Sequence, residues 1–271
     1  MGEPIPLLCP ICRGVLQRGE KSLCCGKNHS FDIARQGYIN LLPVQQKHSL
    51  NPGDTKEMLS ARRRFLQAGY YLPIAESVSV VLQTYTDGSP LVVDVGCGEG
   101  YYTALMKQRC AGRYIGVDIS KDGVKMACSA DKEICWLVAT ASSLPLPDGQ
   151  ADAVTAMFSL LLAEEYRRIL KPGGCVIEVT VGSDHLRELK EIIYDEVFEQ
   201  HKHPAACPEG FREPLCEEHR FTLSLSNEPL RDLLCMTPHF WRIHQERREA
   251  LEATGSLTVT VHYWVRVLQK I

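Results

Sequence analysis

Three cysteines and one histidine near the N-terminus have the types and spacing of a metal site. Cys9 and Cys12 form a C-x2-C pair, and Cys25 and His29 form a C-x3-H pair that begins thirteen residues after Cys12. Thiolates and imidazole in this pattern are the ligands of tetrahedral Zn²⁺. Four protein ligands leave no coordination position for water. The pattern therefore predicts one structural zinc ion bound by these four side chains.

Two alternatives to this ligand set remain open from the residues alone. Cys24 competes with Cys25, although Cys25 has the better spacing to His29. A C-x2-C pair is also found in redox proteins, but there it begins a helix that follows a strand, and the segment around Cys9 lacks that pattern. Zinc also explains how about forty residues of low apolar content reach a fold.

A second motif is the apolar run Val92–Val95, which leads into a turn containing Gly96, Gly98 and Gly100. Glycines at the end of a strand let the backbone approach a ligand closely. The dinucleotide motif G-x-G-x-x-G requires glycine at position 101, where this chain has tyrosine. Asp94 disfavours a pyrophosphate and favours a cationic ligand such as S-adenosylmethionine.

Asp118 ends the next apolar run along the chain, Tyr114–Val117. An acidic residue at this place in nucleotide-binding folds accepts hydrogen bonds from ribose hydroxyls. A glycine-rich turn alone can be an ordinary tight loop. The combination with Asp94 and Asp118 favours a cofactor site.

Short β-rich runs alternate with helical stretches in the middle of the chain, which predicts an α/β fold with a mostly parallel sheet and helices on both faces. The predicted strands are Leu91–Val95, Tyr114–Val117, Ile134–Ala139, Ala153–Phe158 and Cys175–Val181. The predicted helices between them span about 100–109, 121–130 and 160–169.

The flanking segments carry further predicted elements. Residues 43–54 are polar and contain Pro52-Gly53, so they are predicted to be a linker, with Asp54 as a helix N-cap and Glu57 as its capping-box partner. The remaining predicted elements are helices from Asp54 to Ala68, from Pro73 to Thr84, from Asp184 to Glu199, at 229–235 and at 243–253, a loop at 201–214, and strands at 220–226 and 257–267.

Composition limits the class of protein. The chain has 271 residues, of which 45% are apolar and 23% charged, as in soluble globular proteins rather than disordered chains, fibres or coiled coils. No apolar run reaches the ~18 residues of a membrane span, and no secretory signal is recognisable. We therefore expect a cytoplasmic protein without a membrane partner, whose twelve cysteines stay reduced.

Positive charge is concentrated in the N-terminal part. Residues 1–72 contain ten Lys/Arg and five Asp/Glu, whereas the remainder contains twenty and twenty-eight. Arg62, Arg63 and Arg64 lie on one predicted helix turn. We interpret this turn and the basic N-terminal segment as an RNA-binding surface. A solvated helix face is the alternative.

The cofactor motifs resemble those of class I S-adenosylmethionine-dependent methyltransferases, as does the turn Lys171-Pro172-Gly173-Gly174. A closer resemblance, to the bacterial 23S rRNA guanine-N1 methyltransferases, covers nearly the whole chain. Its motifs are the C-x2-C and C-x3-H pairs, Gly37-Tyr38-Ile39-Asn40-Leu41-Leu42-Pro43, Pro52-Gly53-Asp54, Gly69-Tyr70-Tyr71-Leu72-Pro73, Asp94 to Tyr102, His185-Leu186 and Met236-Thr237-Pro238.

This resemblance implies methyl transfer from S-adenosylmethionine to N1 of one guanine in a 23S rRNA hairpin, by a homodimer. It implies cofactor contacts by Tyr71, Gly98, Glu99 and His185. It predicts a division of the chain into three parts. These are a zinc-binding, RNA-recognising domain at 1–42, a linker with helices at 43–89 and the methyltransferase domain at 90–271.

The acceptor of the guanine N1 proton is unknown, and Glu164 and Glu165 are candidates by position. The alternative is that both are ordinary residues of a first helical turn. The stretch Phe158 to Ala163 departs from the proline-containing segment of the family. Two other functions therefore stay open, namely methylation of a small molecule and RNA binding by a catalytically silent relative.

Overall fold

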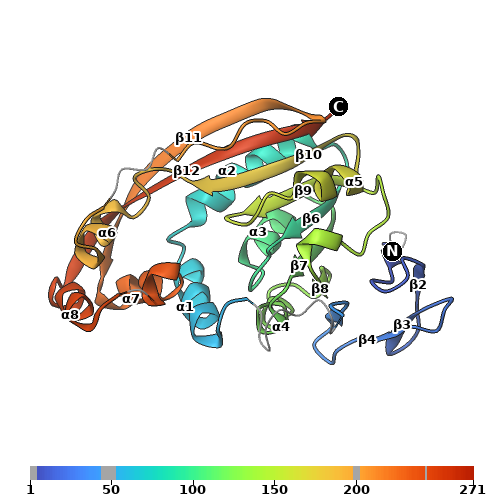
Figure 1. The fold of residues 1–271 in the computed structure, drawn as a ribbon, viewed down its shortest axis with the longest axis horizontal. Helices are drawn as coiled ribbons and strands as arrows, with labels where there is room; N and C mark the ends of the chain where they lie inside the picture. The colour runs from blue at the N-terminus through green and yellow to red at the C-terminus, as the bar shows by residue number, and fades with distance from the viewer. Residues whose placement is uncertain (1–4, 44–52, 198–201, 242) are drawn as a thin grey trace.

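The computed structural model describes residues 5–43, 53–197, 202–241 and 243–271, which form two sheets (Figure 1). Four short N-terminal strands pair in the order β1-β2-β3-β4. The large sheet has eight strands in the order β11-β12-β10-β9-β6-β7-β8-β5. Its strands from β10 to β5 pair in parallel, and β12 and β11 add to β10 as an antiparallel hairpin. This is the class I methyltransferase fold.

The elements have the following bounds. The strands are β1 Leu7–Leu8, β2 Val15–Arg18, β3 Ser22–Cys25, β4 Ser30–Asp32, β5 Ile39–Asn40, β6 Leu91–Val95, β7 Arg113–Asp118, β8 Cys135–Val138, β9 Ala151–Met157, β10 Leu170–Val181, β11 Phe211–Ser226 and β12 Ser256–Lys270. The α-helices are α1 Lys56–Gln67, α2 Leu72–Tyr85, α3 Tyr101–Arg109, α4 Lys121–Ala127, α5 Ala163–Ile169, α6 Arg187–Ile193, α7 Asn227–Cys235 and α8 Gln245–Ala253. Short 3-10 helices lie at Ala141–Ser143 and at Pro238–Trp241.

Both faces of the parallel sheet are apolar and buried. Successive residues of a strand point to opposite faces, and in β6 Val92 belongs to one apolar cluster whereas Val93 belongs to the other. Helices α1, α2, α3, α4, α6 and α7 contribute to the first cluster. The second cluster contains Tyr166 and Ile169 of α5. A parallel sheet needs such cover on both sides.

The N-terminal strands supply much of the remaining cover of this second face. Leu7, Leu16 and Leu23 share an apolar cluster with the second-face residues of β6, β7 and β8. Strand β5 pairs in parallel with β8, and the Leu8 N–H donates a 2.9 Å hydrogen bond to the Pro145 carbonyl. The zinc-binding segment therefore packs directly against the methyltransferase sheet (Figure 1).

Helix α1 begins one residue later than the capping pattern predicts. Thr55 is the N-cap, and its hydroxyl accepts a 3.3 Å hydrogen bond from the Met58 N–H. The prediction of Asp54 as the cap was wrong because the Asp54 carboxylate pairs with Arg62 instead. Residues 44–52 of the predicted linker lie outside the described residues.

Two C-terminal predictions were wrong in extent. The helix predicted from Asp184 to Glu199 is the shorter α6, which ends at Ile193, and residues 198–201 lie outside the described part of the chain. The strand predicted at 220–226 begins at Phe211. Pairing with β12 extends it through a polar, exposed stretch that carries no apolar pattern.

Among the described residues, no single helix is long and apolar enough to cross a membrane. Helices α1 and α2 pass that test only as a pair, and they are bent by 78° at their junction. Buried core helices of soluble proteins pass the same test, and the apolar residues of α1 and α2 are largely buried.

A buried ion pair joins the parallel sheet to the antiparallel hairpin. Arg266 on β12 is 1% exposed and pairs with Glu178 on β10, which is 5% exposed. The Arg266 guanidinium also donates a 2.6 Å hydrogen bond to the Ala205 carbonyl and lies 3.2 Å from a Glu213 oxygen. Removing one partner of such a pair leaves an uncompensated buried charge.

We therefore expect Arg266→Leu to lower the free energy of unfolding by about 3–5 kcal/mol. Arg212→Ala is the control, because this exposed arginine on the same hairpin bonds only the Gln269 amide, and its loss should cost below about 1 kcal/mol. Urea denaturation measures both changes. Equal stability of the two variants would contradict this role for Arg266.

Candidate functional site

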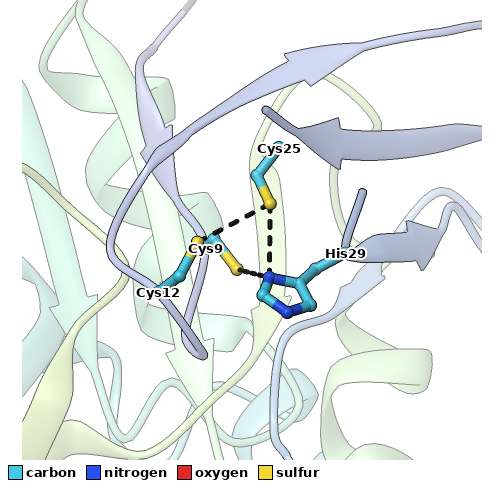
Figure 2. A group of neighbouring side chains, drawn as sticks. All are labelled: Cys9, Cys12, Cys25 and His29. Atoms are coloured by element: carbon cyan, nitrogen blue, oxygen red, sulfur yellow. Dashed lines mark hydrogen bonds between the residues drawn. The ribbon is translucent and has the colours of Figure 1, made fainter. Parts of the chain in front are cut away.

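The predicted zinc ligands converge in one cluster (Figure 2). Cys9, Cys12, Cys25 and His29 each place one ligand atom within 4.8 Å of the others. The Cys12 and Cys25 sulfurs are 3.6 Å apart, and the His29 Nδ1 lies 3.4 Å from the Cys9 sulfur and 3.3 Å from the Cys25 sulfur. Zn–S bonds of about 2.3 Å place tetrahedral sulfurs about 3.8 Å apart. The residues therefore fit a four-coordinate zinc ion.

Two backbone turns present these ligands. Arg13, with a positive φ of 59°, follows the first pair, and Asn28, with a φ of 64°, lies within the second. On β3, Leu23 and Cys25 are buried whereas Cys24 is exposed and lies near serine hydroxyls. The period of a strand thus directs Cys25, and not Cys24, into the cluster. Burial opposes ionisation of the Cys25 thiol, but backbone N–H groups of the second turn lower its pKa to about 6.

The glycine turn after β6 is packed tightly on the side away from solvent. A Cβ atom at Gly96 would lie 2.8 Å from the Ser159 Cβ, and one at Gly100 would lie 2.8 Å from Ala127 and Trp136. Gly96, Gly98 and Gly100 all have positive φ. The turn leads into α3, so it presents backbone groups at the carboxyl edge of the sheet, where ligands of open α/β sheets bind.

The two predicted aspartates have different surroundings. Asp94 is 1% exposed, and its oxygens accept hydrogen bonds from the Thr103 and Thr155 hydroxyls. Burial raises the pKa of Asp94 to about 6, against the effect of these hydroxyls. Asp118 is half-buried and accepts N–H bonds of 2.8 Å from Gly98 and 2.7 Å from Ser120. Asp94 thus ties β6 to its neighbours, and Asp118 holds the glycine turn.

Arg62 on α1 lies over this turn. A Cβ atom at Gly98 would be 3.7 Å from the Arg62 guanidinium. The same guanidinium pairs with Asp54 and donates a 3.2 Å hydrogen bond to the Met236 carbonyl. Glu99 is 4% exposed, and burial raises its pKa while the positive charges of Arg63 and Arg62 oppose the shift. Arg62 therefore joins α1 and α7 to the predicted cofactor edge.

The other two arginines of the predicted RNA-binding turn differ from Arg62. Arg64 makes a two-pronged ion pair with Asp232 of α7. Arg63 donates a 2.7 Å hydrogen bond to the Ser129 hydroxyl. The three guanidinium groups therefore have separate partners within the fold and do not form one open basic surface.

The residues Tyr71 and His185 lie near each other, at the same edge of the sheet. Tyr71 precedes α2 and is 4% exposed, and its ring centroid is 6.5 Å from that of His185. The His185 Nδ1 accepts a 3.4 Å hydrogen bond from the His262 N–H. Burial and nearby cations lower the pKa of His185 to about 3, so the imidazole is neutral at physiological pH.

The two glutamates named as candidate proton acceptors lie in the first turn of α5 and have different surroundings. The Glu165 carboxylate accepts a 2.6 Å bond from the Leu144 N–H and pairs with Arg168 at 2.7 Å. Glu164 is exposed in the first turn of α5. These contacts favour the helix-end interpretation of both residues.

Sequence reasoning missed two aromatic residues at this edge. The Tyr102 hydroxyl is buried and has no hydrogen-bond partner among the described residues. Phe158 has a φ of 53°, and its ring centroid is 6.4 Å from that of His185 and 6.5 Å from that of Tyr102. The position of Tyr102 directly after the glycine turn was a usable signal, whereas no sequence pattern marks Phe158 as exposed.

Comparison with known proteins gives two matched regions and several full-length relatives. Residues 7–50 match a zinc-ribbon family described as RlmA, N-terminal, and residues 93–177 match the family described as Methyltransferase domain. The 23S rRNA (guanine(748)-N(1))-methyltransferase of Streptomyces fradiae is 33% identical, with 94% of this chain and 95% of that protein covered. Bacillus subtilis YxjB, assigned provisionally as a 23S rRNA (guanine-N(1)-)-methyltransferase, is 30% identical, with 93% of each chain covered. The chain belongs to the 23S rRNA (guanine-N1)-methyltransferase family of S-adenosylmethionine-dependent enzymes.

Proposed function

We propose that the protein transfers the methyl group of S-adenosylmethionine to N1 of one guanine in a hairpin of 23S rRNA. The observation that carries this proposal is the relationship to the Streptomyces fradiae enzyme, which extends through both the zinc ribbon and the sheet. A small-molecule methyltransferase needs no such ribbon. A silent RNA-binding relative needs no tightly packed glycine turn.

The cofactor supplies an electrophilic methyl group on sulfur, so the protein mainly has to align it with the base. The positive φ angles of Gly96, Gly98 and Gly100 shape the turn that presents backbone groups at this edge. Asp118, Glu99 and Asp94 place carboxylates at the same edge, which suits a cationic nucleoside without phosphate. Tyr71 and His185 extend the site as a tyrosine beside a neutral imidazole. The unpartnered Tyr102 hydroxyl is a polar group that a ligand there would satisfy.

RNA contact is proposed for the zinc-binding module and for Arg63. The exposed basic residues of the module are Arg13, Arg18, Lys21, Lys27 and Arg35. Arg13 is an exception in this module, because its guanidinium donates a 3.0 Å hydrogen bond to the Leu144 carbonyl. Structured RNA is held mainly through its phosphates and its shape, which suits scattered exposed cations.

A homodimer and a cytoplasmic location remain predictions from the family resemblance. Light scattering of the zinc-loaded protein would give the mass of the assembly.

The direct test is methyl transfer from labelled cofactor to 23S rRNA that lacks its modifications. A methyl group at N1 blocks base pairing, so reverse transcriptase should stop at one guanine. Label in a small molecule but not in RNA would favour the small-molecule function. Cofactor binding without transfer to either would favour a silent relative.

Removal of zinc should unfold the N-terminal module and abolish RNA methylation. Structural zinc of this type contributes about 10–16 kcal/mol of apparent binding free energy at neutral pH. We expect one zinc ion per chain by atomic absorption, retained in Cys24→Ser and lost in Cys25→Ser. Zinc retention in Cys25→Ser together with loss in Cys24→Ser would reverse the ligand assignment.

Separate substitutions should distinguish the three arginines. Arg62→Ala should weaken cofactor binding roughly tenfold, because its charge-assisted bonds to Asp54 and the Met236 carbonyl, worth about 1.5–3 kcal/mol each, hold α1 and α7 against the glycine turn. Arg64→Ala should leave cofactor binding unchanged, because this guanidinium contacts Asp232 on the surface. Arg63→Ala should reduce the slope of the logarithm of the RNA binding constant against the logarithm of salt concentration by about one.

Calorimetry with the cofactor and RNA titrations at several salt concentrations measure these effects. If Arg62→Ala weakened only RNA binding and left cofactor affinity intact, Arg62 would belong to the RNA surface and not to the cofactor edge.

A further inference from the structure

The loop after β9 exposes apolar side chains beside the proposed cofactor site. Phe158 is 38% exposed and Leu160 is 78% exposed. Ser159, between them, lies against the glycine turn, where a Gly96 Cβ would be only 2.8 Å from the Ser159 Cβ. The loop is therefore at the carboxyl edge of the sheet, where the acceptor has to meet the methyl group.

The loop is fixed by hydrogen bonds at each of three successive residues. The Phe158 N–H donates to the Val179 carbonyl at 2.9 Å, and the Ser159 hydroxyl donates to the Val95 carbonyl at 2.8 Å. The Tyr166 hydroxyl donates to the Leu160 carbonyl at 2.8 Å. These bonds hold Phe158 in the left-handed region, with a φ of 53°, which non-glycine residues rarely adopt. The strained backbone keeps an aromatic ring partly in solvent.

The surroundings of this ring suit a flat, polar heterocycle. The Phe158 ring stacks on the neutral His185 ring, with centroids 6.4 Å apart and planes at 27°. The Tyr102 ring is 6.5 Å away on another side, and its hydroxyl is the buried group without a partner among the described residues. The Phe158 ring is accessible to solvent in spite of these two neighbours. A base would therefore stack on the accessible side of Phe158.

We propose that Phe158 is the stacking platform for the target guanine, and that Leu160 packs against the hairpin bases exposed when this guanine leaves its stack. The proposal rests on the proposed function and assigns a substrate-contacting residue within it. Enzymes that modify a base move it out of its stack and hold it against aromatic and apolar side chains. Among the described residues of this edge, Phe158 and Leu160 are the large apolar side chains that are exposed for that contact.

The test compares Phe158→Leu and Phe158→Tyr with Val80→Ala, an exposed apolar residue on α2 that is 61% accessible. Phe158→Leu should lower kcat/KM for the RNA about tenfold or more, since base stacking on an aromatic ring is lost. Phe158→Tyr should retain most of the activity, and Val80→Ala all of it. Calorimetric affinity for S-adenosylmethionine should stay within about twofold in all three variants.

A fluorescence measurement reports on the stacking itself. The guanine at which primer extension stops is replaced in a hairpin RNA by 2-aminopurine, whose emission rises on leaving the stack and is quenched by an aromatic ring. Emission of the complex should be low with the wild type and Phe158→Tyr, and clearly higher with Phe158→Leu.

Two results would contradict the stacking role proposed for Phe158. One is unchanged kcat/KM and unchanged emission in Phe158→Leu. The other is an equal loss of cofactor affinity, which would mean that Phe158 acts on the cofactor through His185. Both differ from failure of the proposed function, in which the wild type itself methylates no RNA.

Discussion

The whole structure depends on covering a parallel sheet that is apolar on both faces. Helices cover the first face, whereas α5 and the zinc-binding strands share the second. The zinc ligands lie in a segment too poor in apolar residues to fold without an added constraint. Cys9, Cys12, Cys25 and His29 can supply that constraint by binding a metal ion, and the leucines of the same segment belong to the apolar cluster of the second face.

The carboxyl edge of the sheet combines a closely packed glycine turn with several carboxylates. The glycine turn fits against Ser159, Ala127 and Trp136, so larger residues would displace its neighbours. Asp94 and Asp118 are held by hydroxyl and amide donors, which keep carboxylates in a partly apolar setting. Arg62 brings α1 and α7 to this edge, and its charge balances the acids there. The position of α1 is thus physically linked to the glycine turn.

The RNA-binding role expected for the arginines of α1 stays a prediction, and the structure gives each of them a different partner. Three consecutive arginines on a helix project in different directions, and each meets a different part of the fold. Arg62 faces the glycine turn, Arg64 pairs with α7, and Arg63 bonds a serine. Arg64 is itself exposed, and further exposed positive charge lies on the zinc-binding module, next to the sheet whose edge holds the proposed reaction site.

Sequence alone determined the features that are local in the chain. Ligand spacing determined the zinc cluster, apolar runs determined the parallel strands, and the glycine pattern placed the turn after β6, because each follows from residues close together in sequence. The tertiary structure decided the choice of Thr55 over Asp54, the length of β11 and the partners of Glu165. It also exposed Phe158. These features depend on contacts between residues far apart in the chain, such as Asp54 with Arg62 or β11 with β12, and no local pattern encodes them.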